Sequence, residues 1–211
     1  MLKEFKAINE DKICVLERSV NDLKEILDQL SQWNIPNDVF TKTDLKNLCT
    51  SFIQNQQNDI ENLQPGSWCL NKEMIYNSEA RVDFVFFPTY YVIAILTRVL
   101  MEYPEIAHLI PDYNDTLKRG YLFSSYRSLQ GHGIDSTEYL IKAFEILVKG
   151  RVTEYLNSDK NFSPALYALI KKIIKDARKK LKTGKTVEGF DRDYKEGYEY
   201  IISVTKELNF N

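Results

Sequence analysis

The segment that decides the fold lies near the middle of the chain, where residues 88–103 read PTYYVIAILTRVLMEY. Proline is favoured in the first turn of a helix, so Pro88 marks an expected helix start. From Thr89 to Tyr103 the sequence is apolar on nearly every side, which is typical of a helix surrounded by other helices. This segment therefore predicts a buried central helix over about 89–103.

Apolar residues at helical spacing continue on both sides of this segment. Toward the N-terminus they predict one helix carrying Leu16, Val20, Leu23, Leu27 and Leu30, and a second carrying Leu45, Leu48 and Phe52. The other face of the second helix is Gln/Asn-rich over 54–58 and is expected to be solvated. Toward the C-terminus the spacing predicts a short helical turn around His108 and helices over about 112–129, 135–150, 163–184 and 191–208.

The pattern as a whole predicts an all-α protein with about seven helices, packed as helical hairpins around the buried central helix. Little or no strand is expected. A faint strand signature is confined to Val82, Phe84 and Phe86, which alternate with their neighbours.

Length and composition favour a single domain. The chain has 211 residues, of which 44% are hydrophobic and 27% charged, as in ordinary folded proteins. We expect one helical domain over 1–211. The alternative is a helical pair over 1–63 followed by an aromatic-rich body over 64–211, divided at the loop around Pro65.

Charge, cysteine usage and targeting signals exclude several classes of protein. The formal net charge of −2 removes the strongest cue for a nucleic-acid binder. The three cysteines Cys14, Cys49 and Cys69 form no CxxC pair, which favours a reducing compartment. The acidic N-terminus does not read as a signal peptide, and the apolar run over 84–97 is shorter than the roughly 20 residues of a bilayer crossing. A cytoplasmic protein without a membrane segment is expected.

Metal and cofactor sites are not expected. The two histidines, His108 and His132, are separated by several predicted elements, which argues against a histidine-based metal site. No hydrolase, zinc-protease or kinase motif occurs.

The junction between two predicted helices holds the strongest candidates for chemistry. Arg127, His132 and Asp135 place a cation, an imidazole and a carboxylate within nine residues, and glycines flank the histidine. A histidine in such a place can donate or accept a proton near neutral pH. The simpler alternative, which the sequence favours, is that Gly131 stops one helix, Asp135 caps the next, and His132 has no catalytic role.

The spacing Arg127-x4-His132 resembles the motif of the HEPN family of helical ribonucleases and toxin components. The resemblance implies that Arg127 and His132 would act together on an RNA phosphodiester. The sequence departs from the family pattern at Ser128, where a polar Asn, Asp or His is usual, and at Gly131, which would disrupt the helix carrying the motif.

A second resemblance covers about residues 65–156. The motifs Gly66-Ser67-Trp68, Phe87-Pro88-Thr89-Tyr90 and Gly131-His132-Gly133-Ile134-Asp135 are spaced like those of helical-hairpin arrays of the α/α-toroid kind. The chain is too short for a complete ring and lacks the acidic signatures of its prenyl-chemistry members. The resemblance implies a concave centre, and the residues expected near such a pocket, besides the three at the junction, are Trp68, Asp83, Tyr90 and Tyr91.

A basic stretch over 171–185 contains eight Lys or Arg residues against one Asp. Helical spacing places its lysines on the side opposite the apolar residues, where they could contact phosphates. The commoner alternative is a solvated helix face, whose charge the acidic N-terminal region could balance. The candidates for nucleic-acid contact are Lys172, Lys175, Lys179 and Lys182.

The leading functional expectation is a non-enzymatic helical binding protein whose partner is another protein or a second copy of the chain. Few alanines and many Lys, Asn, Ile and Tyr residues suggest an A·T-rich coding source, such as a bacterium or a mobile element. The first alternative is a small hydrolase or ribonuclease using Arg127, His132 and Asp135. The second alternative is nucleic-acid binding through the basic helix over 171–185.

Overall fold

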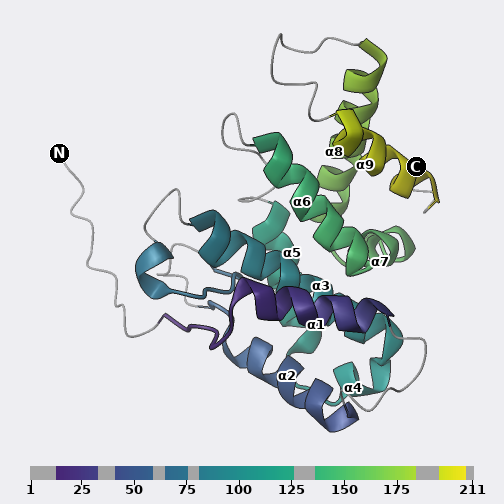
Figure 1. Cartoon of the computed structure of the whole chain (residues 1–211). Coiled ribbons are helices and arrows are strands. Elements are labelled where there is room, and N and C mark those ends of the chain that lie inside the picture. The colour runs from purple at the N-terminus through teal and green to yellow at the C-terminus, as the bar shows by residue number, and fades with distance from the viewer. Residues whose placement is uncertain are drawn as a thin grey trace, which may run out of the picture.

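A computed structural model describes residues 13–32, 41–58, 65–75, 81–125, 136–183 and 195–207. All the regular secondary structure of these residues is helical, and no strand occurs among them (Figure 1). The all-α prediction is confirmed. The α-helices are α1 (Val20–Gln32), α2 (Lys42–Gln54), α3 (Phe87–Glu102), α4 (Pro104–His108), α5 (Tyr113–Phe123), α6 (Ser136–Lys149), α7 (Val152–Ser158), α8 (Pro164–Thr183) and α9 (Lys195–Glu207). A 3-10 turn, η2 (Lys72–Ile75), and a π-helical turn, η3 (Val82–Phe86), precede α3.

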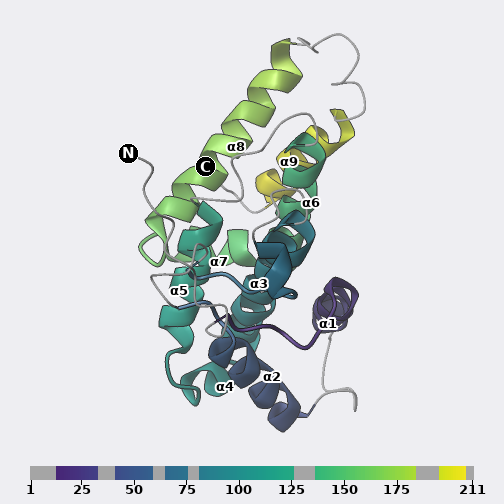
Figure 2. The same cartoon turned by 90° about the vertical axis from the view of Figure 1, so that its left-hand side faces the viewer.

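Helix α3 lies in the interior of the protein. The structure describes all sixteen of its residues, and twelve of them are buried. Helices α1, α4, α5, α6 and α7 all contact it, and Figure 2 shows α3 between α1 and α5. Pro88 stands in its first turn, as the sequence predicts. The arrangement of the surrounding helices as successive hairpins stays a prediction.

The helical segment containing α3 is longer than the sequence indicates. Turn η3 continues into α3 without a break, so the helical run over Val82–Glu102 has 21 residues and is long and apolar enough to cross a membrane. The sequence argument from length was therefore wrong, because the charged residues at its two ends do not end the helix. Burial instead favours a core helix, because 78% of the most apolar window is buried inside the protein.

The faint strand signature before α3 is also wrong. Val82 accepts a hydrogen bond from the backbone N–H of Phe87, five residues later, which defines a π-helical turn. Val85 and Phe86 are neighbours in sequence and both are buried, which a half-buried strand with alternating faces does not allow.

Helix α1 begins later than the apolar pattern predicts. The backbone N–H of Ser19 donates to the Asp22 carboxylate at 2.7 Å, and the N–H of Asp22 donates to the Ser19 hydroxyl at 3.1 Å. This reciprocal cap starts the helix at Val20. Leu16 is buried as expected, but it lies before the helix in a segment without regular secondary structure, where its N–H donates to the Cys69 carbonyl at 2.8 Å.

The Gln/Asn-rich stretch after α2 is not solvated throughout. Helix α2 starts with a capping box between Thr41 and Asp44, close to the predicted position. At its end, Gln56 and Gln57 are only 2% and 1% exposed. The expectation of a solvated face failed there because both side chains find buried backbone partners, described below.

The corner between α6 and α7 has two backbone features. Gly150 follows α6, as predicted, but the glycine is required by close packing: a Cβ there would lie 2.3 Å from the Cβ of Ala94 in α3. The next residue, Arg151, has a left-handed backbone with φ of 59°. Helix α7 begins directly after it and was not predicted.

The remaining predicted helices occur at their expected places, and α8 and α9 end the described part of the fold. The predicted ends over 126–135, 184–194 and 208–211 lie outside the described residues. The buried apolar side chains form one cluster that extends from Ile13 to Ile201. The division of the chain at about residue 64 stays a prediction.

Candidate functional site

Helix α8 has one apolar face, and this face holds the helix to the body. The helix starts at Pro164, as predicted, and the N–H of Tyr167 in its first turn donates to the Ser163 carbonyl at 3.0 Å. Contacts with α5, α7 and α9 cover the apolar side. The buried residues of this face are Leu166, Ile170, Ile173, Ile174 and Ala177.

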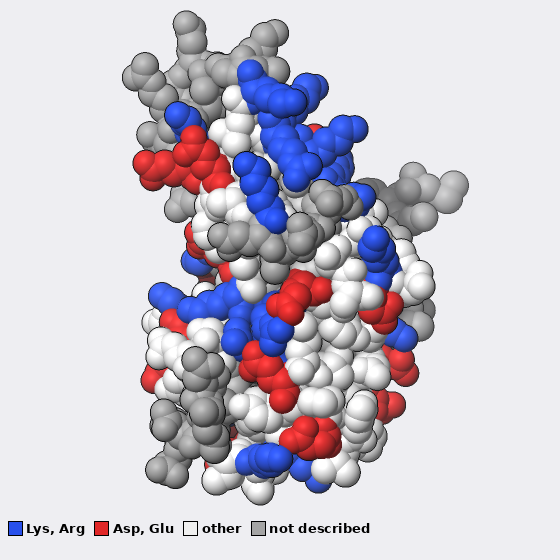
Figure 3. All heavy atoms as spheres, turned by 90° about the vertical axis from the view of Figure 1, so that its right-hand side faces the viewer, with Lys and Arg blue, Asp and Glu red and all other residues white. Residues whose placement is uncertain are grey.

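The opposite face of α8 is basic and exposed. At 100° per residue its cations occupy an arc of roughly 120°, and a rise of 1.5 Å per residue extends them over roughly 16 Å. Figure 2 shows α8 along one edge of the molecule with α9 on its inner side. Figure 3 shows Lys and Arg side chains gathered at the top of the molecule. Among the described side chains of α8, the exposed cations of this "basic face" are Lys171, Lys172, Lys175, Arg178, Lys179 and Lys182.

Three cations of this basic face have no carboxylate partner among the described residues. Asp176 is the one acidic residue in the sequence of α8, and it is exposed. Between described residues, no ion pair joins Lys172, Lys175 or Lys182 to a carboxylate.

The acidic N-terminal region does not cover the basic face in the part of it that the structure describes. Helix α1 packs on α3, and Figures 1 and 2 both place α1 away from α8. The intramolecular counterpart expected from the sequence is therefore absent from residues 13–32 and 41–58.

Two cations of α8, one beside the basic face and one at its edge, contact tyrosine side chains. Lys180 donates to the Tyr198 hydroxyl at 2.5 Å and lies 4.8 Å from the centre of its ring, which ties α8 to α9. Lys171, at the edge of the basic face, lies 5.7 Å from the ring of Tyr167 on the same helix.

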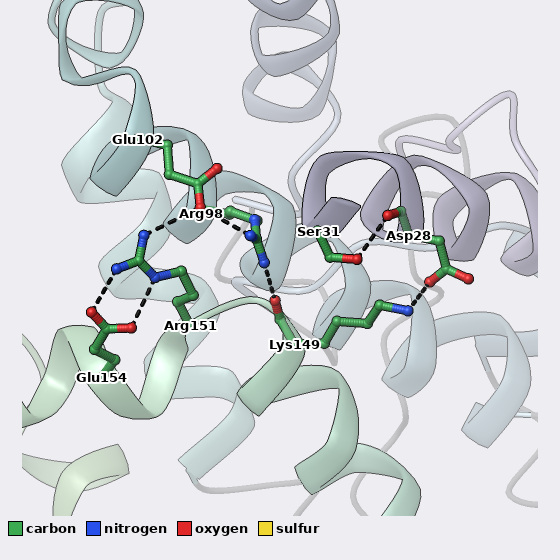
Figure 4. A network of polar contacts seen from close by, with 7 residues as sticks. All are labelled: Asp28, Ser31, Arg98, Glu102, Lys149, Arg151 and Glu154. Carbon is green, nitrogen blue, oxygen red and sulfur yellow. Dashed lines mark hydrogen bonds and ion pairs between the residues drawn. The ribbon is translucent and has the colours of Figure 1, made fainter. Parts of the chain in front are cut away.

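A second group of charges lies where α3, α6 and α7 meet (Figure 4). Arg151 donates to both carboxylate oxygens of Glu154, at 2.8 and 2.6 Å, and to Glu102 at 3.2 Å. Arg98 forms an ion pair with the same Glu102 at 3.0 Å and donates to the Lys149 carbonyl at 2.7 Å. The hydrogen bonds with Arg151 lower the pKa of Glu154, and those with Glu154 raise the pKa of Arg151.

This network continues to α1. The ammonium of Lys149 pairs with the carboxylate of Asp28, and Ser31 donates to the Asp28 carbonyl at 2.7 Å. The charges of the network pair with one another and join α1, α3, α6 and α7, although the buried Nε of Arg98 has no hydrogen-bond partner among the described residues. We therefore assign the network to the stability of the fold, in contrast to Lys172, Lys175 and Lys182 on α8.

Two of the predicted pocket residues are completely buried in the core. Trp68 donates from its indole nitrogen to the Phe52 carbonyl at 2.6 Å and from its backbone N–H to the Thr89 hydroxyl at 3.0 Å. Tyr90 is also fully buried, and its hydroxyl accepts a hydrogen bond from that of Tyr139 at 3.4 Å.

The other two differ in their surroundings. Tyr91 is 5% exposed, and burial raises its pKa. Asp83 is exposed, so its carboxylate needs no partner of the kind that a buried charge requires. A pocket lined by these residues stays a prediction.

The predicted catalytic residues Arg127, His132 and Asp135 lie outside the described residues. Their convergence on one site, and both family resemblances that depend on this stretch, stay predictions. Among the described residues no group of three or more His, Cys, Asp or Glu side chains is placed to hold a metal ion.

Sequence reasoning missed a buried polar cluster next to Trp68. The side-chain amide of Gln56 donates to the carbonyls of Gly66 and Thr116, at 3.2 and 2.8 Å, and its oxygen accepts from Arg119 at 2.8 Å. Gln57 pairs in the same way with the backbone N–H and carbonyl of Cys14. No local pattern marks these glutamines, because their partners lie up to 63 residues away in sequence.

Sequence reasoning also left Lys171 and Arg178 out of the candidates for phosphate contact. The signal was present, since both follow from turning α8 by 100° per residue. Comparison with known proteins adds no further candidate: no protein-family profile, characterised protein or solved structure matches this chain.

Proposed function

We propose that this protein works by non-enzymatic binding of an anionic macromolecule, and that the basic face of α8 is the contact surface. The observation that carries the proposal is the row of exposed cations on α8, three of which, Lys172, Lys175 and Lys182, have no ion pair with a carboxylate among the described residues. The proposal keeps the expectation of a non-enzymatic binding protein, but it replaces the expected protein partner with an anionic one and takes its surface from the second alternative.

The basic face lowers the stability of the helix that carries it. Lysines and arginines three or four positions apart, such as Lys171 and Lys175 or Arg178 and Lys182, repel each other, and each such pair destabilises a helix by about 0.2–0.5 kcal/mol. The apolar face and the contact of Lys180 with Tyr198 hold α8 to the rest of the protein. A bound polyanion would relieve this repulsion, so α8 would be more stable in the complex than in the free protein.

The location that fits this proposal is the bacterial cytoplasm, with the protein encoded by a bacterium or by its mobile element. Cys14, Cys49 and Cys69 are all free thiols, and free thiols persist in reducing compartments. The low alanine content and abundance of Lys, Asn and Ile support the source. Detection of the protein in the soluble cytoplasmic fraction of cells that express it would test the location, and recovery from the medium or the membrane would contradict it.

The test compares two variants that carry the same net charge. Lys172, Lys175 and Lys182 on the basic face are replaced by glutamate in one, and Lys24, Lys46 and Lys72, exposed lysines elsewhere, in the other. Both changes lower the net charge equally, so a difference between them reports location. Binding to labelled heparin, duplex DNA and polyglutamate is measured by fluorescence anisotropy at 50 mM salt, and circular dichroism checks folding.

We expect the wild type to bind at least one of these polyanions, the α8 variant to bind at least tenfold more weakly, and the control to stay within about threefold of wild type. Equal losses in the two variants would contradict the assigned surface. Failure of the wild-type protein to bind any of the three would overturn the proposed function.

A further inference from the structure

We propose that the partner of the basic face is the phosphate backbone of double-stranded nucleic acid, bound without sequence preference. This inference rests on the function proposed above and names the class of partner. Four features of the described surface carry it: its side-chain chemistry, the burial of its apolar side, the spacing of its charges, and the lack of a platform for stacking bases.

The side chains of the basic face do not suit a protein partner. Protein–protein interfaces are depleted of lysine, and they depend on a few buried aromatic, apolar or arginine anchors. Five of the six cations here are lysines. The large apolar side chains that the described structure exposes are Leu109 and Leu122, at 65% and 48%, and neither lies on α8. A protein partner would find charge on this face but no anchor.

The burial of the apolar side of α8 argues against a membrane surface. A helix that binds a bilayer places its apolar face among the acyl chains and keeps its cations at the headgroups. In α8 that apolar face is already in the protein core, with Leu166 and Ile170 completely buried. Attachment to lipid would have to rely on charge alone, and the helix would have no insertion energy.

The spacing of the cations suits a regular line of phosphates. Duplex DNA carries one negative charge per about 1.7 Å of its axis, so a helix face about 16 Å long meets several phosphates in any register. Lysine ammonium groups bind phosphates as point charges and read no base sequence. Arg178 is the one arginine on the basic face. The face therefore offers a single guanidinium group of the kind that recognises guanine through two hydrogen bonds.

The face also lacks the features of a single-strand binder. Proteins that bind single strands stack the bases on exposed aromatic rings. Tyr167 is the aromatic residue in the sequence of α8, and its partly exposed ring is already approached by Lys160 and Lys171, at 5.5 and 5.7 Å. The basic face therefore favours a duplex, in which the bases stack on one another.

The experiment measures how salt changes the affinity. Two 24-base-pair duplexes of unrelated sequence, their single strands, polyglutamate and anionic vesicles are titrated with the full chain between 50 and 200 mM salt. Six phosphate contacts predict that duplex affinity falls about 10³-fold over this range, and removal of three of them predicts a fall of only about 40-fold. The K172Q/K175Q/K182Q variant removes the charges without adding new ones, and K172R/K175R/K182R should restore the wild-type salt dependence.

We expect both duplexes to bind with equal affinity and the single strands to bind more weakly. α8-dependent binding to polyglutamate or vesicles but not to duplexes would overturn this inference and leave the proposed function standing. No binding to any polyanion would overturn both. A preference of more than tenfold for one duplex, or a salt dependence unchanged in the K172Q/K175Q/K182Q variant, would contradict the backbone contact inferred here.

Discussion

Arg151 donates to both carboxylate oxygens of Glu154, at 2.8 and 2.6 Å, while its own backbone occupies the left-handed region with φ of 59°. This conformation costs a residue with a Cβ about 1–2 kcal/mol, whereas glycine adopts it freely. The bidentate pair, together with the contact to Glu102, offsets that cost and fixes the corner between α6 and α7.

The first prediction separates these two effects. Both R151G and R151A lose the ion pairs, but only R151A keeps the backbone strain. We expect R151A to be less stable than R151G by about 1 kcal/mol in urea unfolding. R151K keeps the positive charge but loses the guanidinium group that donates two hydrogen bonds to Glu154, and it should also be less stable than wild type. An R151A protein as stable as R151G would show that the left-handed backbone carries no strain.

The second prediction concerns pH. Hydrogen bonds with Arg151 lower the pKa of Glu154 below its ordinary 4.5 in the folded protein. A depressed pKa stabilises the folded state above the unfolded value, and this stabilisation is lost as the pH falls through the folded value. We expect E154Q to be less stable than wild type at pH 6, and the difference to shrink as the pH falls below about 4.5. E25Q, which changes an exposed carboxylate on α1, is the control measured in parallel.

The fold class could be predicted from the sequence because helical spacing is a local signal. The segment over 88–103 and the caps before α1 and α2 depend on residues within a few positions of one another. The buried state of Gln56 and Gln57 could not be predicted in this way, since it depends on partners such as Cys14 and Arg119 that only the folded chain brings near.

The basic face illustrates the same distinction between local and long-range information. Its composition and its orientation follow from the sequence of α8 alone. Lys172, Lys175 and Lys182 form no ion pair with a described carboxylate. This absence depends on where the other helices pack.

The third prediction tests the buried glutamine cluster. Loss of the Gln56 amide would leave the carbonyls of Gly66 and Thr116 and a donor of Arg119 without this partner. Each buried polar group left unsatisfied costs about 1–3 kcal/mol, so Q56L should lower the unfolding free energy by at least 2 kcal/mol. Q54L, the same change at an exposed position two residues earlier, should stay within about 0.5 kcal/mol of wild type. Equal effects would contradict the cluster.

The fourth prediction ranks the thiols by reactivity. Burial raises the pKa of Cys49 to about 12 and that of Cys69 to about 11, whereas Cys14 is partly exposed. At pH 8 a thiol with a pKa of 12 has about one part in 10⁴ as the reactive thiolate. We expect an alkylating reagent to label Cys14 first in the native protein and all three thiols at similar rates in urea. Rapid native labelling of Cys49 would contradict its burial.

The fifth prediction separates binding from catalysis. If the protein only binds, labelled RNA and DNA incubated with it stay intact, and R127A and H132A leave the affinity for duplexes within about twofold of wild type. Cleavage by the wild type that both substitutions abolish would favour the ribonuclease alternative instead. Titration of the His132 ring by NMR, in the wild type and in R127A, gives an independent reading: a pKa that depends on Arg127 indicates coupled groups, as in a catalytic site.

The length of the buried helical segment has a consequence during synthesis. Val82–Glu102 can be covered fully only after α5, α6 and α7 exist, and α7 ends about 56 residues later. At roughly 5–20 residues per second, the ribosome takes roughly 3–11 s to supply that cover. For those seconds the nascent chain presents a stretch as apolar as a membrane anchor to the chaperones and targeting factors that survey new proteins. The same helix that organises the finished core is therefore the part of this chain most exposed to aggregation and mistargeting before the core forms.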